Sequence, residues 1–214
     1  MQVKKISGVT GVILAGGASS RMGSNKALLL HRGGRIIEGI YRTLANIFEE
    51  VIIVTGTPQL YNFLPCRKVP DVYVGKGVPG GIHSGLVHSK NLAIFAAACD
   101  MPHLNEEFIR YLCSLSGSAD LVIPSTCSGF EPLHSIYRRG CLSALEEILK
   151  GETGRRVTDI MSQVRVRKVL LKEIALFDPE FKTFDNINTP EEYFRFRCST
   201  IKPPGADLIM HMKS

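Results

Sequence analysis

The sequence predicts an α/β protein built around a mostly parallel central sheet. Short β-branched and aliphatic runs alternate along the chain with segments of helical periodicity, which is the pattern of βαβ units. The segment Leu92–Cys99, LAIFAAAC, is apolar at consecutive positions rather than alternate ones. A strand with this pattern is typically covered on both faces, so we expect it in the middle of the sheet.

The length and composition favour one domain. The chain has 214 residues, of which 44% are hydrophobic and 21% are charged, an ordinary balance for a globular protein. No internal repeat, low-complexity block or linker divides it. We expect a single domain over residues 1–198 and a poorly ordered tail over residues 199–214, which contain the sequence KPPG.

The individual elements follow from β-branched runs and from helical periods. The expected strands are Val9–Leu14, Val51–Val54, Arg67–Val69, Leu92–Cys99, Leu121–Pro124, Leu133–Tyr137 and Val164–Leu171. The expected helices are Ile36–Phe48, Thr57–Leu64, Ile82–His88, Glu106–Leu115, Cys141–Lys150, Arg156–Met161 and Pro190–Arg197.

Two helix starts carry capping residues. Asn105 precedes two glutamates, which is the pattern of an N-cap followed by first-turn acids. Thr189 precedes Pro190, and proline favours the first helical turn.

Cysteine usage and hydropathy indicate a soluble, cytoplasmic protein. The cysteines are scattered without CxxC or Cys/His clustering, so we expect reduced thiols and no structural zinc. The N-terminal apolar stretch somewhat resembles a signal peptide, but Gly8, Thr10 and Gly11 interrupt it, and cleavage near Ala18 would destroy the glycine loop described below. No run approaches the roughly 18 apolar residues that span a bilayer.

The net charge of +6 is explained by small polyanionic substrates as well as by nucleic acid. The basic residues are dispersed and form no aromatic-interleaved basic stripe, so we expect no nucleic acid as a partner. Since no long apolar run is present, we expect no membrane partner either.

A glycine loop follows the first strand directly, with the residues Leu14, Ala15, Gly16 and Gly17. Open α/β sheets bind ligands at the carboxyl edge of their strands, and unhindered backbone N–H groups there favour phosphate. Arg21 and Lys26 then supply cations. The alternative is a plain strand-to-helix turn, for which two glycines would suffice. That alternative does not explain the ten small or polar residues before the next apolar run.

Two familiar phosphate motifs do not fit. The loop lacks the Gly-Lys-Ser/Thr ending of a P-loop. The formal GxGxxG at Gly75, Gly77 and Gly80 contains Pro79 and follows no adequate strand, so it does not indicate a dinucleotide site.

The first motif, LAGGASSRMGSNKALL, resembles the LAGGxSxRMGxxKxLL signature of molybdenum cofactor guanylyltransferases, within the wider nucleotidyltransferase family. The stretches PD at 70–71, GVPGGIHSGL at 77–86, CDMP at 99–102 and DNINTPEE at 185–192 follow in the order that this family shows. The resemblance implies a three-layer, Rossmann-like nucleotidyltransferase fold. It also implies transfer of GMP from GTP to the phosphate of molybdopterin or molybdenum cofactor, with Mg²⁺ as cofactor, and it is compatible with transient contact with cofactor-supplying proteins and molybdoenzymes.

The resemblance also assigns roles to residues. Catalysis falls to Lys26, Arg21 and Asp100, and nucleotide binding to Leu14, Ala15, Gly16, Gly17, Lys26, Asp71 and Asp100. Acceptor binding falls to Gly80, Gly81, Arg156, Asn186 and Asn188, with Arg155 and the segment 131–134 beside them. The metal ligands would be Asp100 and Asn188.

Asp100 is also supported without the resemblance, because it ends the most buried strand and magnesium prefers hard oxygen ligands. Its alternative role, as a helix cap, is already filled by Asn105. For the asparagines and for Asp71, turn chemistry or a plain surface loop stays open, and the arginine pair could equally be a solvated helix start.

Base selectivity is less secure than the reaction class. Gly17 favours guanine by the family's own correlation, but Val54 and Thr55 stand where many members carry Asn or Ser after the second strand. If a side chain there recognises guanine, Thr55 or a backbone group must substitute. A CTP-dependent cytidylyltransferase of the same cofactor, a sugar-phosphate nucleotidyltransferase and an inactive nucleotide-binding scaffold are the alternatives.

Overall fold

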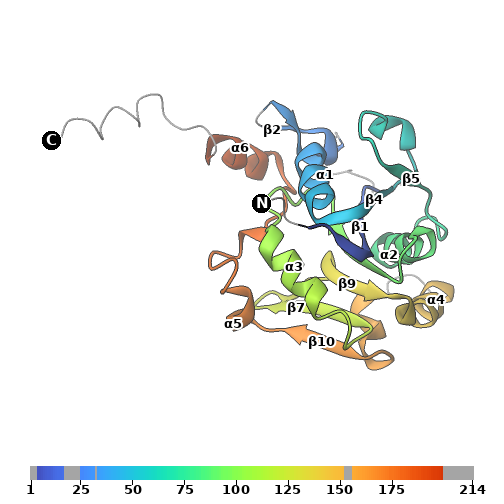
Figure 1. The fold of residues 1–214 in the computed structure, drawn as a ribbon. Helices are drawn as coiled ribbons and strands as arrows, with labels where there is room; N and C mark the ends of the chain where they lie inside the picture. The colour runs from blue at the N-terminus through green and yellow to red at the C-terminus, as the bar shows by residue number, and fades with distance from the viewer. Residues whose placement is uncertain (1–3, 17–24, 32, 152–155, 200–214) are drawn as a thin grey trace.

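The structure is a computed structural model that describes residues 4–16, 25–31, 33–151 and 156–199. Its central sheet has the strand order β10–β7–β9–β6–β1–β4–β5 (Figure 1). These strands are β1 (Ile6–Leu14), β4 (Phe48–Val54), β5 (Arg67–Val69), β6 (Ala93–Ala98), β7 (Leu121–Thr126), β9 (His134–Arg138) and β10 (Val166–Val169). On this path only β9 runs against its neighbours, so the mostly parallel sheet is confirmed.

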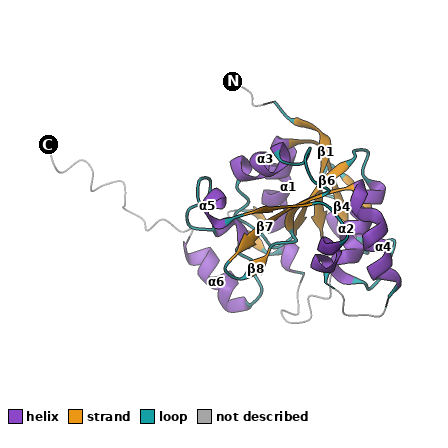
Figure 2. Cartoon of the chain, turned by 90° about the horizontal axis from the view of Figure 1, so that it is seen from below, coloured by secondary structure: helices purple, strands orange, loops and turns teal. Residues whose placement is uncertain are grey.

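Helices cover both faces of the sheet, as the edge-on view in Figure 2 shows. The helices α1 (Ile36–Ile47) and α3 (Glu106–Ser114) pack on one face, and α2 (Gly77–His88) and α4 (Leu142–Lys150) pack on the other. Alternate residues of β6 feed the two cores: Phe95 and Ala97 join α1 and α3, whereas Ile94 and Ala96 join α2 and α4. The expected three layers are therefore present.

The strand β6 lies in the middle of the sheet, between β1 and β9. Its residues Ala93 to Ala97 are all buried, which is why the sequence shows consecutive apolar positions there. The prediction of a central strand is confirmed.

Smaller elements complete the chain. They are η1 (Lys26–Leu28), β2 (Leu30–His31), β3 (Gly34–Arg35), η2 (Pro58–Tyr61), β8 (Gly129–Phe130), η3 (Arg139–Cys141), η4 (Val157–Ser162), α5 (Leu171–Ile174), η5 (Lys182–Phe184) and α6 (Pro190–Ser199). Both predicted caps are confirmed: Asn105 accepts a hydrogen bond from the Phe108 N–H, and Thr189 accepts one from the Glu192 N–H.

Several boundaries differ from the prediction. The helix α2 begins at Gly77, whereas the sequence predicted a start at Ile82. The prediction missed the first turn because its glycines and proline show no helical hydrophobic period. The last strand, β10, is shorter than expected, and Leu171 begins the helix α5 instead of ending a strand. The predicted tail lies mostly outside the described residues. Among those that are described, no helix is long and apolar enough to cross a membrane.

Candidate active site

A cavity of about 850 Å³ lies at the carboxyl edge of the sheet, and we call it the strand-end cavity. It is lined by Leu14, Ala15, Gly16, Asn25, Lys26, Val54, Gly56, Thr57, Asp71, Gly75, Gly77, Val78, Gly81, Ala98, Cys99, Asp100 and Leu133. Four strands with parallel neighbours, β6, β1, β4 and β5, end here side by side. Parallel strands bring their carboxyl ends to one edge, so motifs far apart in the sequence meet in this cavity.

A single lysine joins the two predicted metal ligands. Lys26 Nζ donates a hydrogen bond of 2.8 Å to Asn188 Oδ1 and lies 3.6 Å from Asp100 Oδ2. The side chains of Lys26 and Asp100 are each only 17% exposed, so solvent screens this ion pair less than a surface pair. Burial raises the pKa of the Asp100 carboxyl, and the nearby ammonium opposes that rise.

The backbone brings the DNINTPEE segment to the end of β6. The Ile187 N–H donates a hydrogen bond of 3.1 Å to the Asp100 carbonyl, and the Ile187 side chain is buried in the core. Directly after Asn188, Thr189 and Glu192 cap α6 reciprocally, since the Thr189 N–H also donates to Glu192. Asn188 is therefore held between a buried anchor and a capped helix.

The two predicted metal ligands suit magnesium chemically. Asp100 offers a carboxylate and Asn188 an amide oxygen, and both are already directed at one positive charge. Magnesium binds hard oxygens, retains waters and needs only one or two carboxylates. Across the described part of the chain no cluster of three or more His, Cys, Asp or Glu side chains forms that could hold a metal ion.

Asp71 lies at the other end of the strand-end cavity, after the edge strand β5. Gly16 approaches it closely: a Cβ atom on Gly16 would lie 3.3 Å from Asp71 Oδ2. The hydroxyl of Ser84 donates to the Gly80 carbonyl at 2.9 Å and lies 3.5 Å from Asp71 Oδ1. Burial raises the pKa of Asp71, so its carboxylate is sensitive to a hydrogen-bond donor that enters the cavity.

The structure places the Thr55 side chain inside the protein. Its side chain is 1% exposed, and its Oγ1 accepts a hydrogen bond of 3.1 Å from the Thr57 N–H. Thr55 does not line the cavity, whereas Gly56 and Thr57 do. A ligand in the cavity could therefore meet this loop at Gly56 and Thr57, because the Thr55 hydroxyl is used inside the protein.

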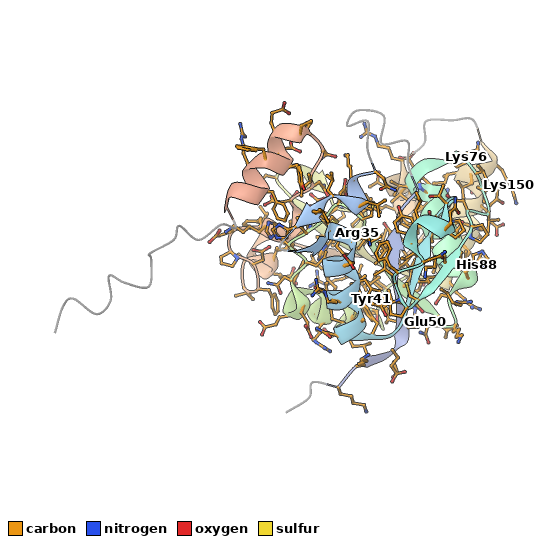
Figure 3. The ribbon with its side chains drawn as sticks, turned by 90° about the horizontal axis from the view of Figure 1, so that it is seen from above. Arg35, Tyr41, Glu50, Lys76, His88 and Lys150 are labelled. Carbon is orange, nitrogen blue, oxygen red and sulfur yellow. The ribbon has the colours of Figure 1, made fainter. Side chains whose placement is uncertain are left out.

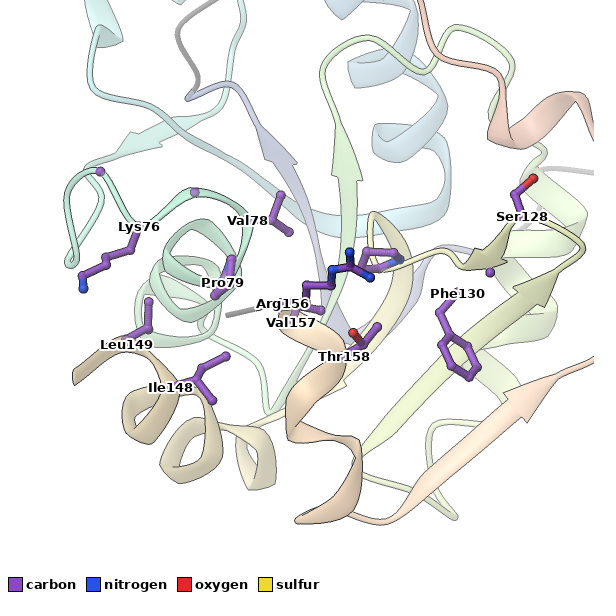
Figure 4. Close-up of a pocket in the computed structure, with 14 residues that line it drawn as sticks. Lys76, Val78, Pro79, Ser128, Phe130, Ile148, Leu149, Arg156, Val157 and Thr158 are labelled. Carbon is purple, nitrogen blue, oxygen red and sulfur yellow. The ribbon is translucent and has the colours of Figure 1, made fainter. Parts of the chain in front are cut away.

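A second cavity of about 690 Å³, the side cavity, adjoins the first, and Gly75, Gly77 and Val78 line both. Its wall is largely apolar, and Figure 4 shows the Arg156 side chain at the start of η4 between Val78 and Phe130. Lys76 stands at the rim and donates a hydrogen bond of 3.2 Å to the Gly151 carbonyl, next to Lys150 at the end of α4 (Figure 3). Arg156 is thus separated from Lys26 and Asp100 and belongs to the side cavity.

The predicted acceptor residues divide between several places. Gly81 lines the strand-end cavity, and a Cβ atom there would lie 3.0 Å from the Leu14 side chain. Gly80 lines neither cavity. A Cβ atom on Gly80 would lie 2.9 Å from the Tyr73 carbonyl oxygen, so the close packing of α2 against this carbonyl explains why a glycine stands there. Asn186 is exposed. Gly17, Arg21 and Arg155 lie outside the described residues.

Sequence reasoning missed other residues of the strand-end cavity. Cys99 lines it, but burial raises the pKa of this thiol to about 12, so it stays protonated and is a poor nucleophile. Asn25 and Thr57 also line it. The signal for Asn25 was present, because an Asn at the start of a helical segment, here one residue before the apolar run that begins at Ala27, is typical of a cap.

This arrangement can be compared with known proteins. The family model for the MobA-like NTP transferase domain matches residues 11–166, which is more than half of the chain. The chain belongs to this family. A probable molybdenum cofactor guanylyltransferase from Peptoclostridium acidaminophilum is 35% identical over 208 residues. The match covers 93% of this chain and 94% of the relative. A second protein so named, from Pelotomaculum thermopropionicum, is 38% identical over 189 residues, covering 88% of this chain and 91% of its own.

The solved structures agree on the fold. Molybdopterin-guanine dinucleotide biosynthesis protein A from Archaeoglobus fulgidus superimposes with a TM-score of 0.78 at 24% identity, over 90% of this chain and all of the other. CMP:2-keto-3-deoxy-manno-octonic acid synthetase in complex with CTP superimposes with a TM-score of 0.67 at 13% identity, over 90% of this chain and 98% of its own. With the MobA-like family established, the protein is a nucleotidyltransferase, and the resemblance inferred from its motifs is confirmed.

Proposed function

We propose that this MobA-like NTP transferase transfers GMP from GTP to the phosphate of molybdopterin or molybdenum cofactor, and that pyrophosphate leaves. The relatives that match over nearly the whole chain are named for this activity. The observation that carries the proposal in the structure is the convergence of three side chains: Lys26 and Asp100 line the strand-end cavity, and Lys26 Nζ also donates a hydrogen bond to the exposed residue Asn188. A partly buried carboxylate beside a cation and an amide oxygen favours a catalytic nucleotidyltransferase over an inactive nucleotide-binding scaffold.

In the proposed reaction an oxygen of the acceptor phosphate attacks the α-phosphorus of GTP. A new P–O bond forms, the bond between the α-phosphorus and its bridging oxygen breaks, and the electron pair leaves on pyrophosphate. Both reactants are anionic, so the protein must mainly neutralise charge and hold the groups in line. Lys26 places an ammonium where the triphosphate would lie, and Leu14 to Gly16 offer a backbone surface beside it.

Magnesium would be held by Asp100 and Asn188, and when bound it would offset the charge that develops on the phosphates. Lys26 is near enough to both ligands to turn from them to a phosphate, because its side chain is long and flexible.

The two cavities suggest where each substrate binds. If the triphosphate lies beside Lys26 and Asp100, the nucleoside extends along the strand ends toward Thr57 and Asp71. The side cavity would then take the acceptor, since Phe130 and its apolar neighbours suit a flat heterocycle and Arg156 suits a phosphate. The shared wall at Gly75, Gly77 and Val78 allows the two substrates to meet.

The decisive experiment gives the purified protein molybdopterin, Mg²⁺ and each of GTP, CTP, UTP and ATP in turn. We expect the guanine dinucleotide and pyrophosphate from GTP, measured by chromatography and mass spectrometry. Preferential use of CTP would replace the proposal by cytidylyl transfer, and use of a sugar phosphate in place of molybdopterin would replace the acceptor. Omission of Mg²⁺, with a chelator present, tests the metal requirement separately.

A further inference from the structure

Asn25 has both of its side-chain polar groups engaged. Its Oδ1 accepts a hydrogen bond of 3.1 Å from the Ala27 N–H, which caps η1. Its Nδ2 donates a hydrogen bond of 2.9 Å to the hydroxyl of Tyr61. Because one amide group makes both contacts, the orientation of Asn25 fixes the start of η1 relative to η2.

The hydrogen-bond partner of Asn25, Tyr61, is fully buried in the core. Tyr61 is 0% exposed and ends η2, the short helix that follows the cavity residues Gly56 and Thr57. On the other side, Ala27 is also fully buried, so η1 is pinned to the core immediately beside its cap. Asn25 therefore ties the start of η1 to the end of η2, across 36 positions of the sequence.

Lys26 is the first residue of η1 and directly follows this cap. The direction in which its side chain leaves the backbone depends on how η1 sits, and in the observed position Nζ reaches both Asn188 and Asp100. A displacement of about 1 Å at a catalytic group can cost a factor of about 100 in rate.

We infer that Asn25 is a positioning residue for Lys26, which acts by holding η1 against Tyr61 so that the ammonium lies at the triphosphate end of the strand-end cavity. This inference rests on the proposed role of Lys26 in binding phosphate. It assigns to Asn25 no contact with the reacting atoms.

A double-mutant cycle tests the inference. We expect Asn25→Ala to lower kcat/KM for GTP by about tenfold in the wild-type background and by less than about twofold in a Lys26→Ala background, because residues that act through one another are not additive. CTP and GTP should be affected alike, since a misplaced ammonium weakens every triphosphate. An equal loss in both backgrounds would mean that Asn25 acts independently of Lys26 and would overturn the inference.

Two milder variants separate the contacts. Asn25→Ser keeps a capping oxygen but loses the link to Tyr61, and Tyr61→Phe loses the same link from the other side. We expect these two variants to lose similar, smaller factors of kcat/KM than Asn25→Ala. A normal kcat/KM in both would show that the Tyr61 contact positions nothing, which contradicts the inference.

Asn105 provides a matched control, because it caps α3 through the same kind of hydrogen bond, to the Phe108 N–H at 2.9 Å, away from the strand-end cavity. Asn105→Ala should lower Tm without a change in kcat/KM measured well below Tm. If it lowers kcat/KM as much as Asn25→Ala does, the loss of any helix cap explains the effect and positioning is refuted.

The double-mutant cycle of Asn25→Ala and Lys26→Ala is repeated with a second readout. Calorimetry measures how tightly each of the four proteins binds inorganic triphosphate in the presence of Mg²⁺. This readout needs neither guanine nor an acceptor, so it keeps the inference apart from the proposed function. Non-additive affinities with no transfer from GTP would remove the proposed reaction and leave the inference standing. Additive affinities in an active enzyme, or no triphosphate binding by the wild-type protein, would overturn the inference.

Discussion

Lys26 Nζ lies 2.8 Å from Asn188 Oδ1, although 162 positions separate the two residues in the sequence. The same ammonium lies 3.6 Å from Asp100 Oδ2. Lys26 thus holds, by hydrogen bond and ion pair, the two oxygen groups that we propose as ligands of Mg²⁺. A cation in this place supports the charged form of Asp100 but competes with any metal ion that approaches it.

Lys26→Met should therefore raise the affinity for a metal ion alone and lower the affinity for the metal–nucleotide complex. Without nucleotide, Mn²⁺ used as a probe should bind about tenfold more tightly, because a competing charge near a partly buried carboxylate is removed. With GTP present, the complex should be weaker and turnover lower, since a contact to the triphosphate is lost. Mn²⁺ binding is followed by electron paramagnetic resonance and GTP binding by calorimetry.

Asp100→Asn is the matched control for that experiment, since it preserves shape but removes the charged ligand. It should abolish the tighter Mn²⁺ binding in the Lys26→Met background and lower turnover by orders of magnitude while the fold persists. Unchanged Mn²⁺ affinity in Lys26→Met would show that the lysine and the metal do not compete.

Gly16→Ala should weaken GTP binding without a loss of stability. The added methyl would meet Asp71 Oδ2 at 3.3 Å, so this carboxylate must shift away from its place in the cavity. We expect a loss of affinity of about threefold to tenfold by calorimetry, the scale of one perturbed hydrogen bond.

Gly39→Ala controls for the change of residue type. Gly39 lies inside α1, and nothing lies within 4 Å of an added Cβ atom there. Alanine should stabilise this helix by about 0.5–1 kcal/mol and leave GTP affinity unaltered. Equal GTP affinities for Gly16→Ala and wild type would show that the contact between Gly16 and Asp71 is not part of the nucleotide site.

Arg156→Ala should affect the acceptor and spare the nucleotide. Arg156 lines the side cavity and not the strand-end cavity. Loss of a guanidinium contact to a phosphate should raise KM for molybdopterin by about tenfold, within the range for a charge-assisted hydrogen bond. Steady-state kinetics with each substrate varied in turn measure this. A rise in KM for GTP alone would place Arg156 at the nucleotide instead.

His134 makes the fold sensitive to acid. It is fully buried beside Phe95 and Phe108, and neither ring nitrogen has a hydrogen-bond partner. Burial lowers the pKa of His134 from 6.5 to about 3. The unfolded chain binds a proton below pH 6.5 while the folded protein does not, so stability falls as the pH falls, by about 2 kcal/mol between pH 7 and pH 5 from this group.

His134→Phe and His134→Leu should remove that part of the pH dependence. Two variants guard against overpacking of a tight aromatic cluster. Chemical denaturation at several pH values should show that the gain over wild type is small near pH 7.5 and grows toward pH 5. A gain that does not change with pH would mean that His134 is not the titrating group.

Local patterns in the sequence predicted the layers of the fold and named the residues of the candidate site. The apolar run at residues 92–99 indicated a central strand because a strand covered on both faces carries apolar residues at consecutive positions of its own sequence, and β6 lies mid-sheet as expected. The caps at Asn105 and Thr189 were predictable for the same reason, since each involves only neighbours in the chain. The start of α2 was not, because a turn of glycines and proline has no hydrophobic period, and its close approach to Leu14 and Tyr73 is a tertiary contact.

Only the tertiary structure decided which side chains meet. The motifs named Lys26, Asp100 and Asn188 separately, but their contact depends on the parallel register of β1 and β6 and on the bond from Ile187 to Asp100. Likewise, the position of a residue after a predicted strand does not determine whether its side chain points into the cavity or into the protein. Thr55 turned into the protein and Thr57 came to line the cavity, because the Thr55 hydroxyl satisfies a backbone N–H in its own loop.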